Sequence, residues 1–437
     1  MTVSGWRTVH LADLVEVRHG FAFKGEFIRD NPPGDVLVTP GNFAIGGGFQ
    51  QERPKYYDGP VQAEYVLQPG DLILTMTDLS RCGDTLGYPA IVPKGGNGRY
   101  LHNQRIGRVV IRDEGEVDRE FLYYRLRARD YRHEILAGAT GTTVRHTAPE
   151  RILRFTFALP PLDEQRSIAG VLSALDDKIE LNRRMNEALE AMERALFKGW
   201  FVDFAPVRAK AAGRRPYGMD DAAAALFPQA FEASELGEIP AGWGVACIGD
   251  SVRVVGGTTP RTDEPSFWDG GDICWATPKD LSRLTDQVLL DTERHITPEG
   301  LSQISSGLLP SGTVLLSSRA PIGYLALAEV PVSINQGFVA MVCDGNLPNQ
   351  YVLRWCETNM DAIKARANGT TFLEVSKASF RPIPCLIPSA EVLRAFIQQV
   401  QPLHARLVCN LRESGTLAEM RDTLLPKLLS GEVRVKP

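Results

Sequence analysis

Two stretches of the chain carry apolar residues at every seventh position, the pattern of a helix that packs along another helix. In the first stretch, Leu162 to Phe204, the repeated position holds Ile168, Leu175, Asn182, Leu189 and Leu196. In the second, near the C-terminus, it holds Phe396, Leu403, Asn410, Leu417 and Leu424. A lone asparagine in such a seam fixes the register of a helix pair. We therefore expect antiparallel helices in which Asn182 faces Asn410 and the two amides bond each other; two unrelated amphipathic helices, each on its own domain, are the alternative.

Two prolines interrupt the second helical stretch. Pro402 has no N–H to bond the carbonyl of Gln398, so it is expected to kink or shorten the first turns of this helix. Pro426 is expected to end the helix early.

The rest of the chain has the pattern of two mixed, strand-rich domains. Short apolar, β-branched runs such as DVLVTP, GDLILTM and IGRVVI are bounded by Gly, Pro and Asp. One helical segment, Arg119 to Leu136, interrupts them and stops at Ala137-Gly138. The fold class predicted from these patterns is α+β, with two mixed α/β domains separated by an antiparallel pair of long helices.

The second domain repeats landmarks of the first in the same order. Matching pairs are Gly5-Trp6 and Gly242-Trp243, Gly70–Leu74 and Gly312–Leu316, Gly87-Tyr88 and Gly323-Tyr324, Asn103-Gln104 and Asn335-Gln336, and 141–143 and 369–371. A collinear set of this kind indicates a tandem duplication, which commonly closes as a pseudo-dimer. The predicted parts are domain 1 (1–160), helix 1 (161–204), a connector (205–240), domain 2 (241–388) and helix 2 with the tail (389–437). The connector is rich in Ala, Gly, Pro and charge, so we expect it to have little core of its own.

Composition places the chain among ordinary globular proteins of more than one domain. It has 437 residues, of which 43% are hydrophobic and 23% charged. No apolar run approaches the roughly 20 residues of a membrane span and no secretory segment is recognisable, so a cytoplasmic location is expected. The 7 cysteines are scattered without a CxxC, and the 7 histidines form no HExxH or HxH pattern. These spacings argue against disulfides and predict no metal site.

Charge is segregated along the chain although the net charge is only −5. Between Arg119 and Arg154 there are eight arginines and four acids, and between Asp163 and Glu193 eight acids and four bases. Solvated helix faces would explain both segments. A basic segment for phosphates and an acidic helix for a protein partner would explain them as well.

Motifs of catalysis are weak in this sequence. Asn31-Pro32-Pro33 resembles the NPP motif of amino-methyltransferases, but the usual aromatic residue does not follow and no strand with a Gly-rich turn precedes it. A Pro-Pro-Gly turn explains it better. Gly46–Gly48 precedes no Gly-Lys-Ser/Thr, and no paired carboxylates or nucleophilic triad stands out. We nominate no catalytic residue.

The predicted architecture suits double-stranded DNA with two half-sites. A helix of roughly 40 residues spans about 60 Å, or about 17 base pairs. Two similar but diverged domains held at that distance would read an asymmetric, interrupted sequence.

The chain also resembles the specificity subunit of type I restriction-modification systems. The likeness rests on LPPLDEQRSIAGVLSALDDKIELNRRMNEALEAMERALFKGWFVDFAPV, SELGEIPAGW, GGTTPRTDEPSFWDGGDICWATPKDLS, SINQGF and RDTLLPKLLSGEVRV, and it covers essentially the whole chain. The resemblance implies two target-recognition domains, each reading half of a bipartite DNA site, and two helices that separate them and dock two methyltransferase subunits. It also implies restriction subunits as further partners. S-adenosylmethionine, Mg and ATP would belong to those partners, with no cofactor and no catalysis in this chain.

The residues expected to contact DNA lie in polar loops between strands, where Arg can fork onto guanine and Lys can bind phosphates. In domain 1 they are Lys24, Thr77, Asp78, Arg81 and Arg105; in domain 2 they are Thr258, Thr259, Arg261, Thr262, Lys279, Asp280, Ser317, Ser318 and Arg319. The repeated Asn-Gln pair is better explained as a shared turn than as a base reader. The arginines of 119–136 could contact phosphates or simply face solvent.

Two other functions remain open from the sequence. A self-contained DNA methyltransferase would bind S-adenosylmethionine, and the missing Gly-rich motif speaks against it. A structural coiled-coil adaptor would have no affinity for nucleic acid. Replacing Asn182 and Asn410 together by Leu is expected to keep or raise stability while loosening the register.

Overall fold

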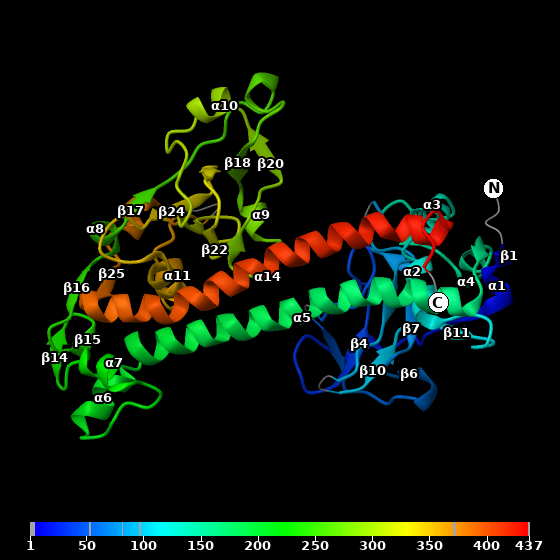
Figure 1. Cartoon of the computed structure of the whole chain (residues 1–437), viewed down its shortest axis with the longest axis horizontal. Helices are drawn as coiled ribbons and strands as arrows, with labels where there is room; N and C mark the ends of the chain where they lie inside the picture. The colour runs from blue at the N-terminus through cyan, green and yellow to red at the C-terminus, as the bar shows by residue number, and fades with distance from the viewer. Residues whose placement is uncertain (1–4, 52–53, 81, 96–97, 370–372, 436–437) are drawn as a thin grey trace. The chain divides into compact units, whose positions relative to one another are not determined.

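The computed structural model describes residues 5–51, 54–80, 82–95, 98–369 and 373–435. The chain divides into two compact units: unit 1 comprises Met1–Glu180 and Glu413–Pro437, and unit 2 comprises Leu181–Arg412. Two long helices, α5 (Leu162–Phe201) and α14 (Ala390–Ser430), each contribute to both units. Each unit is described by itself below (Figure 1).

Unit 1 is built on two sheets. Its strands and helices are β1 Arg7–His10, α1 Leu11–Leu14, β2 Val15–His19, β3 Ile28–Arg29, β4 Asp35–Val38, β5 Lys55–Tyr57, β6 Val66–Leu67, β7 Leu72–Thr75, β8 Thr77–Asp78, β9 Pro89–Ile91, β10 Tyr100–His102, β11 Ile106–Ile111, α2 Arg119–Arg125, α3 Arg129–Ala137, β12 Arg145–His146, α4 Pro149–Ile152 and β13 Thr156–Leu159. One sheet has the antiparallel order β2-β11-β7-β9, and the other has the order β3-β5-β4-β10-β6, in which β10 runs parallel to β4. Two further pairs, β1-β13 and β8-β12, complete the unit.

Unit 2 repeats this topology. Its elements between the long helices are α6 Ala205–Ala211, α7 Asp221–Ala225, β14 Phe231–Ser234, β15 Gly237–Pro240, β16 Gly244–Cys247, α8 Ile248–Ser251, β17 Arg253–Val255, β18 Ile273–Ala276, α9 Pro278–Leu281, β19 Val288–Leu289, β20 Arg294–Ile296, α10 Pro298–Ser302, β21 Val314–Ser317, β22 Leu325–Ala328, β23 Ser333–Ile334, β24 Phe338–Val342, α11 Asn349–Thr358, α12 Met360–Lys364, α13 Lys377–Phe380 and β25 Pro384–Ile387. The order β17-β24-β21-β22 answers β2-β11-β7-β9, and β20-β18-β23 answers β5-β4-β10. The parallel pair recurs as well, since β23 runs parallel to β18. The tandem repeat predicted from the sequence is confirmed.

The central strands of the two units form for the same local reason. The residues of β7 and of β21 are buried along their whole length, as expected for continuous apolar runs. Each follows a glycine with a positive φ, Gly70 at 89° and Gly312 at 88°, which a turn of this kind requires. In unit 2, α11 lies against β21 and β22 and helps to close the core (Figure 1).

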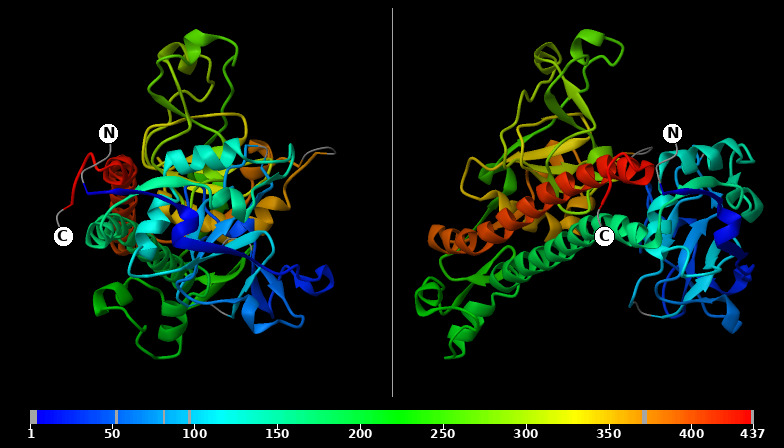
Figure 2. Two further views of the ribbon diagram at one scale, coloured as in Figure 1. Left: turned by 90° about the vertical axis from the view of Figure 1, so that its right-hand side faces the viewer. Right: turned by 45° about the vertical axis from the view of Figure 1, so that its right-hand side comes forward.

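The long helices run antiparallel within each unit. In unit 2, Asn182 contacts Asn410 and Phe197 packs on Phe396; Figure 2 shows these green and orange helix segments side by side. In unit 1, Asp176 of α5 pairs with Arg421 of α14 at 2.7 Å. The antiparallel order follows from these pairs, because the residue number rises on one helix as it falls on the other. The predicted α+β class with an antiparallel helix pair is confirmed.

Two expectations about local structure need correction, and a third point concerns the connector. The segment 119–136 is not one helix: α2 ends at Arg125 and α3 starts at Arg129. The helix α14 does not end at Pro426 but continues to Ser430, whereas it bends within its part in unit 2, as expected for a helix containing Pro402 (Figure 1). The connector has no separate core, but its apolar residues are covered: Val207, Phe227 and Ile239 are buried with Trp200 and Phe201 of α5.

Candidate nucleic-acid interface

In unit 1, loops that follow three strands meet and bond through their backbones. The N–H of Phe21 donates to the carbonyl of His102 at 2.8 Å, and the N–H of Gln104 donates to the carbonyl of Phe21 at 2.9 Å. The N–H of Met76 donates to the carbonyl of Arg105 at 2.9 Å. These bonds hold the segments 20–24, 76–78 and 103–105 together.

Unit 2 assembles the corresponding loops in the same way. The N–H of Thr258 donates to the carbonyl of Ile334 at 3.2 Å, and the N–H of Asn335 donates to the carbonyl of Ala276 at 3.1 Å. The N–H of Ser318 donates to the carbonyl of Gly337 at 2.8 Å. The segments 257–262, 277–280, 317–319 and 335–337 therefore form one loop cluster.

The first of these loops depends on a glycine in both units. A Cβ on Gly20 would lie 2.2 Å from the carbonyl oxygen of Asn103, and one on Gly257 would lie 1.8 Å from that of Ile334. Any other residue would collide with the backbone, so the glycine is what lets the loop approach the neighbouring strand. The close approach places the side chains that follow beside the Asn-Gln turn.

The repeated Asn-Gln pair forms the same turn twice. The Oδ1 of Asn103 accepts from the N–H of Arg105 at 3.0 Å, and the Oδ1 of Asn335 accepts from the N–H of Gly337 at 2.8 Å. Each asparagine side chain is thereby committed to its own backbone. These bonds support the interpretation as a shared turn; the adjacent side chains, Arg105 in unit 1 and Gln336 in unit 2, are exposed.

A capping box is a second feature that recurs in both units, and it was not predicted from the sequence. After β4, Thr39 and Asn42 form a capping box around Pro40, and after β18, Thr277 and Asp280 form one around Pro278. The motif Thr-Pro-x-Asn/Asp after an apolar strand was the available signal. Each box fixes a one-turn helix, Pro40–Asn42 in unit 1 and α9 in unit 2, and the second residue of this helix differs between the units: Gly41 in unit 1 and Lys279 in unit 2.

The loops of unit 1 border a groove of about 690 Å³. Polar side chains on its wall include Thr39, Gln50, Lys55, Gln104 and Arg105. Lys55 forms an ion pair with Asp30, whereas the side chain of Arg105 forms no ion pair within the described part of the chain. The groove thus exposes a cation and several amide and hydroxyl groups, the donors used at nucleic-acid surfaces.

The residues predicted in domain 1 divide into two groups. Lys24 and Arg105 are exposed, and Lys24 is only loosely paired with Glu26 at 3.8 Å.

Thr77 and Asp78 are buried: the hydroxyl of Thr77 lies 3.1 Å from Nδ1 of His146, and Asp78 accepts from the N–H of Ser80 at 2.6 Å. Burial raises the pKa of the Asp78 carboxyl, but hydrogen bonds from Ser80 and Thr85 together lower it by more. The pKa of Asp78 therefore lies below its ordinary value. Asp78 is therefore an ionised loop anchor, and the prediction at Arg81 lies outside the described residues.

The exposed candidates of domain 2 are Thr259, Arg261, Thr262 and Lys279. The hydroxyl of Thr259 donates to Gln336, while Arg261 pairs with Asp263 at 3.2 Å and Lys279 with Glu293 at 2.9 Å. Such exposed pairs are weak and cost little to exchange for a phosphate or base contact. Neighbouring carboxylates, Asp263 and Glu293, thus hold the side chains of Arg261 and Lys279 in place on the exposed loops.

The other domain 2 candidates serve the loop itself. Thr258 accepts from the N–H of Ser305, and Asp280 accepts from Thr277 and from the N–H of Glu293 at 2.8 Å. The hydroxyl of Ser317 donates to the carbonyl of Pro321 at 2.8 Å, and Ser318 is buried. Arg319 is half-buried and lies 3.7 Å from Glu374.

Three of the five arginines of 119–136 take neither of the two expected roles, phosphate contact or plain solvent exposure. Arg125 is buried, bonds Asp130 at 2.7 Å and stacks on Phe155. Arg127 bonds Asp176 at 2.9 Å, and Arg132 stacks on Tyr88 with 4.3 Å between guanidinium and ring centre. These three stabilise unit 1 from inside, while Arg119 and Arg129 are exposed.

The central asparagines of the helix pair lie together but bond differently from the expectation. The amide of Asn182 donates to the backbone carbonyl of Asn410 at 3.4 Å, and the amide of Asn410 donates to Oδ1 of Asn186 at 2.9 Å. All three side chains are buried, and the Oδ1 of Asn410 has no hydrogen-bond partner among the described residues. Asn186 lies one turn after Asn182 and off the heptad position, so the seven-residue repeat does not indicate it.

Comparison with known proteins decides the family. A model of the type I restriction modification DNA specificity domain matches residues 3–191 and 240–402, which together make up most of the chain. The chain belongs to this family of DNA specificity subunits. The specificity subunit of the type I restriction enzyme HindI from Haemophilus influenzae is 25% identical over 489 aligned positions, covering 99% of this chain and 100% of the relative. That of MjaIX from Methanocaldococcus jannaschii is 37% identical over 163 residues, covering 37% of this chain and 38% of that protein.

A solved structure has the same fold as this specificity subunit. The S subunit of a type I restriction-modification system from M. genitalium superposes with a TM-score of 0.58 at 16% identity and covers 97% of this chain and 96% of its own. The resemblance inferred from the sequence is confirmed, as is the place of the chain among specificity subunits, which recognise DNA sequence and are non-catalytic. None of the described helices is both long and apolar enough to cross a membrane.

Proposed function

We propose that this specificity subunit reads a bipartite, asymmetric DNA site, with the loop cluster of each unit contacting one half. One observation carries the proposal: the same loop frame is built twice and bears different side chains. The capping-box turn carries Gly41 in one unit and Lys279 in the other, and the Asn-Gln turn is followed by Arg105 in one and Gly337 in the other. A shared frame with different donors is what reading two different sequences requires.

The exposed side chains proposed to contact DNA are Lys24 and Arg105 in unit 1 and Thr259, Arg261, Thr262 and Lys279 in unit 2. Six other predicted residues hold the loops in place, because their polar atoms are buried or bonded to nearby loop backbone. These residues are Thr77, Asp78, Thr258, Asp280, Ser317 and Ser318. The spacing of the half-sites is assigned to the long helices, as the sequence predicts.

We further propose that the long helices dock two methyltransferase subunits and that restriction subunits join the complex. Leu181 and Met192 of α5 are large apolar side chains with exposed fractions of 53% and 52%. They lie eleven residues apart, so they share one face of the helix. Exposed apolar residues on one face favour a protein partner. S-adenosylmethionine, Mg and ATP are assigned to the partners, since this chain is a specificity subunit.

The test of DNA reading is a domain exchange. Residues 1–160 are replaced by those of another family member, the complex is formed with its methyltransferase subunits, and methylated sites are mapped. One half-site is expected to change while the other half and its spacing persist. A change in both halves, or in neither, would refute the modular scheme.

The test of docking uses surface substitutions. Leu181→Glu with Met192→Glu is expected to abolish co-purification with the methyltransferase subunits and to leave DNA binding by the chain unchanged. Leu308→Glu is the matched control, because Leu308 is an exposed leucine, at 46%, on the recognition part of unit 2. Retained co-purification of the double variant would contradict this assignment.

A further inference from the structure

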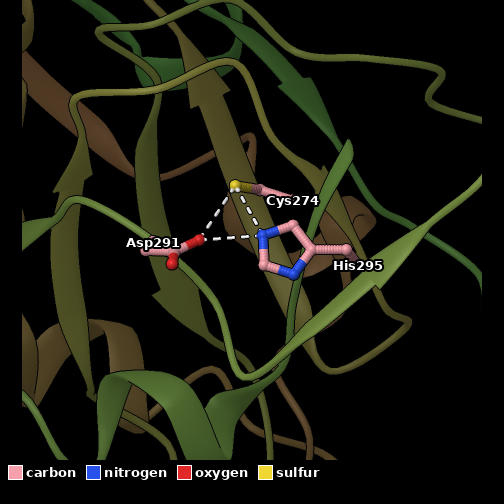
Figure 3. Close-up of side chains that lie close together, drawn as sticks. All are labelled: Cys274, Asp291 and His295. Atoms are coloured by element: carbon pink, nitrogen blue, oxygen red, sulfur yellow. Dashed lines mark hydrogen bonds and ion pairs between the residues drawn. The ribbon is translucent and has the colours of Figure 1, made fainter. Parts of the chain in front are cut away.

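A thiol, an imidazole and a carboxylate converge in unit 2, on β18, on β20 and in the turn that precedes β20. The Sγ of Cys274 lies 3.7 Å from Nε2 of His295 and 3.5 Å from Oδ1 of Asp291, and Nε2 of His295 lies 2.9 Å from the same Oδ1 (Figure 3). The three atoms face one another, and each residue offers a different kind of metal ligand.

The backbone places these groups without help from a ligand. Cys274 on β18 and His295 on β20 are direct partners in an antiparallel ladder. Asp291 precedes β20, and the N–H of Thr292 donates to its Oδ1 at 2.8 Å. The hydroxyl of Thr292 accepts from the N–H of Trp275 at 3.1 Å, which ties the Asp291 turn to β18. The cluster is therefore a property of the strand pairing.

Two of the three separations match those of a tetrahedral zinc site. With Zn–S of about 2.3 Å, Zn–N of about 2.05 Å and Zn–O of about 2.1 Å, the ligand atoms should lie about 3.6 Å (S to N), about 3.6 Å (S to O) and about 3.4 Å (N to O) apart. The two distances from sulfur agree with these values. The distance from nitrogen to oxygen is about half an ångström shorter because these atoms share a hydrogen bond, and the Asp291 side chain, 71% exposed, has room to move outward.

The repeat indicates that the fold itself does not require these residues. The cross-strand pair that corresponds to Cys274 and His295 is Val36 and Tyr56 on β4 and β5 of unit 1. An apolar–aromatic pair supports the same ladder there, as is usual in sheets. The Cys–His pair is thus a feature of unit 2 alone, and a role beyond holding two strands together accounts for it.

We propose that Cys274, Asp291 and His295 bind one Zn²⁺, with water as a fourth ligand on the exposed side of Asp291. A mixed sulfur, nitrogen and oxygen set favours Zn²⁺ over Mg²⁺ or Ca²⁺, which prefer oxygen ligands only. The bound ion links β18, β20 and the turn before β20. The spacing of these three residues along the chain does not indicate such a site, since they lie 17 and 4 residues apart and match no zinc motif.

The test is metal binding by the full-length chain. Purified protein is dialysed with Zn²⁺ and its metal content is measured; in parallel, Co²⁺ is titrated and the thiolate-to-cobalt absorption band is followed. We expect one ion per chain and a band from a single thiolate. Cys274→Ser and His295→Gln should weaken affinity at least tenfold, and Cys274→Ser should also remove the band. Cys409→Ser is the matched control, because Cys409 is an exposed thiol of the same unit and should leave both readouts unchanged.

Thermal unfolding separates loss of the site from loss of folding. Zn²⁺ should raise the Tm of the wild type and of the Cys409→Ser variant but not that of Cys274→Ser, whose Tm without metal should be close to that of the wild type. Absence of bound metal in the wild type would overturn the proposal. So would metal binding that survives both Cys274→Ser and His295→Gln.

Discussion

The buried ion pair between Glu193 of α5 and Arg354 of α11 gives the sharpest test of how the long helix is joined to the recognition fold of unit 2. Oε2 of Glu193 accepts from Nη2 of Arg354 at 2.8 Å, and the side chains are 2% and 3% exposed. Arg354 also bonds Gln287 and Glu357, each at 2.8 Å. Removing the charge of Glu193 would leave the buried guanidinium with Glu357, whose side chain is 30% exposed, as its one remaining ion-pair partner among the described residues.

We therefore predict that Glu193→Gln destabilises unit 2 by about 3 kcal/mol. Loss of one partner of a buried pair costs about 3–5 kcal/mol, and the remaining bonds of Arg354 place this case at the lower end. The corresponding fall in Tm is about 6–12 °C for a unit of this size. Glutamine keeps the shape of the side chain, so no cavity contributes to the effect.

The assay is urea and thermal unfolding followed by tryptophan fluorescence. Five of the six tryptophans, at positions 200, 243, 268, 275 and 355, belong to unit 2, so the signal reports mainly on this unit. The matched control is Asp344→Asn, which breaks the exposed pair with Arg253 and should cost less than about 1 kcal/mol. Glu193→Leu with Arg354→Leu should lie closer to the wild type than Glu193→Gln alone. Equal small losses in Glu193→Gln and Asp344→Asn would refute the reasoning.

Three further predictions concern unit 1 and the helix pair. Burial lowers the pKa of His102 to about 4, so between pH 6.5 and 4 the unfolded chain binds a proton that the folded unit does not. Unit 1 should lose about 3 kcal/mol as the pH falls through this range, whereas His102→Gln should show a flatter profile in unfolding measured at each pH. Arg105→Ala should lower the salt slope of DNA binding by about 0.9, and Arg119→Ala, an exposed arginine paired with Glu114, should not, as measured by titrations at several salt concentrations. Asn410→Leu should cost about 1–3 kcal/mol by leaving Asn186 without its donor, and replacing Asn182, Asn186 and Asn410 together by Leu should restore stability in chemical unfolding.

The parts of the fold that depend on local pattern were predictable from the sequence. The heptads gave both long helices and their antiparallel order, because a polar residue such as Asn182 marks a register. The repeated glycines and Asn-Gln pairs gave the duplication, since turns such as the one at Asn103 constrain the residue type directly.

Features set by distant segments were not predictable. The sequence pattern around Arg125 and Arg127 predicts a basic surface. In the structure, residues far along the chain, such as Phe155 and Asp176, cover these two side chains. The composition of the connector predicts little core, because it has few apolar residues. Val207 and Phe227 are buried only because they pack against α5. Likewise, Cys274 and His295 meet only through strand register, which spacing along the chain does not reveal.

The way α14 ends affects the order in which the protein is completed during translation. Leu428 and Leu429 are buried in the same core as Phe121 and Phe157, and Arg434 bonds Glu164 at 2.9 Å. Unit 1 therefore remains incomplete on the ribosome until residues 413–435 have been translated and have left the ribosome. A premature stop after position 412 would damage the part of the protein that was synthesised first, even though every one of its first 160 residues would be present.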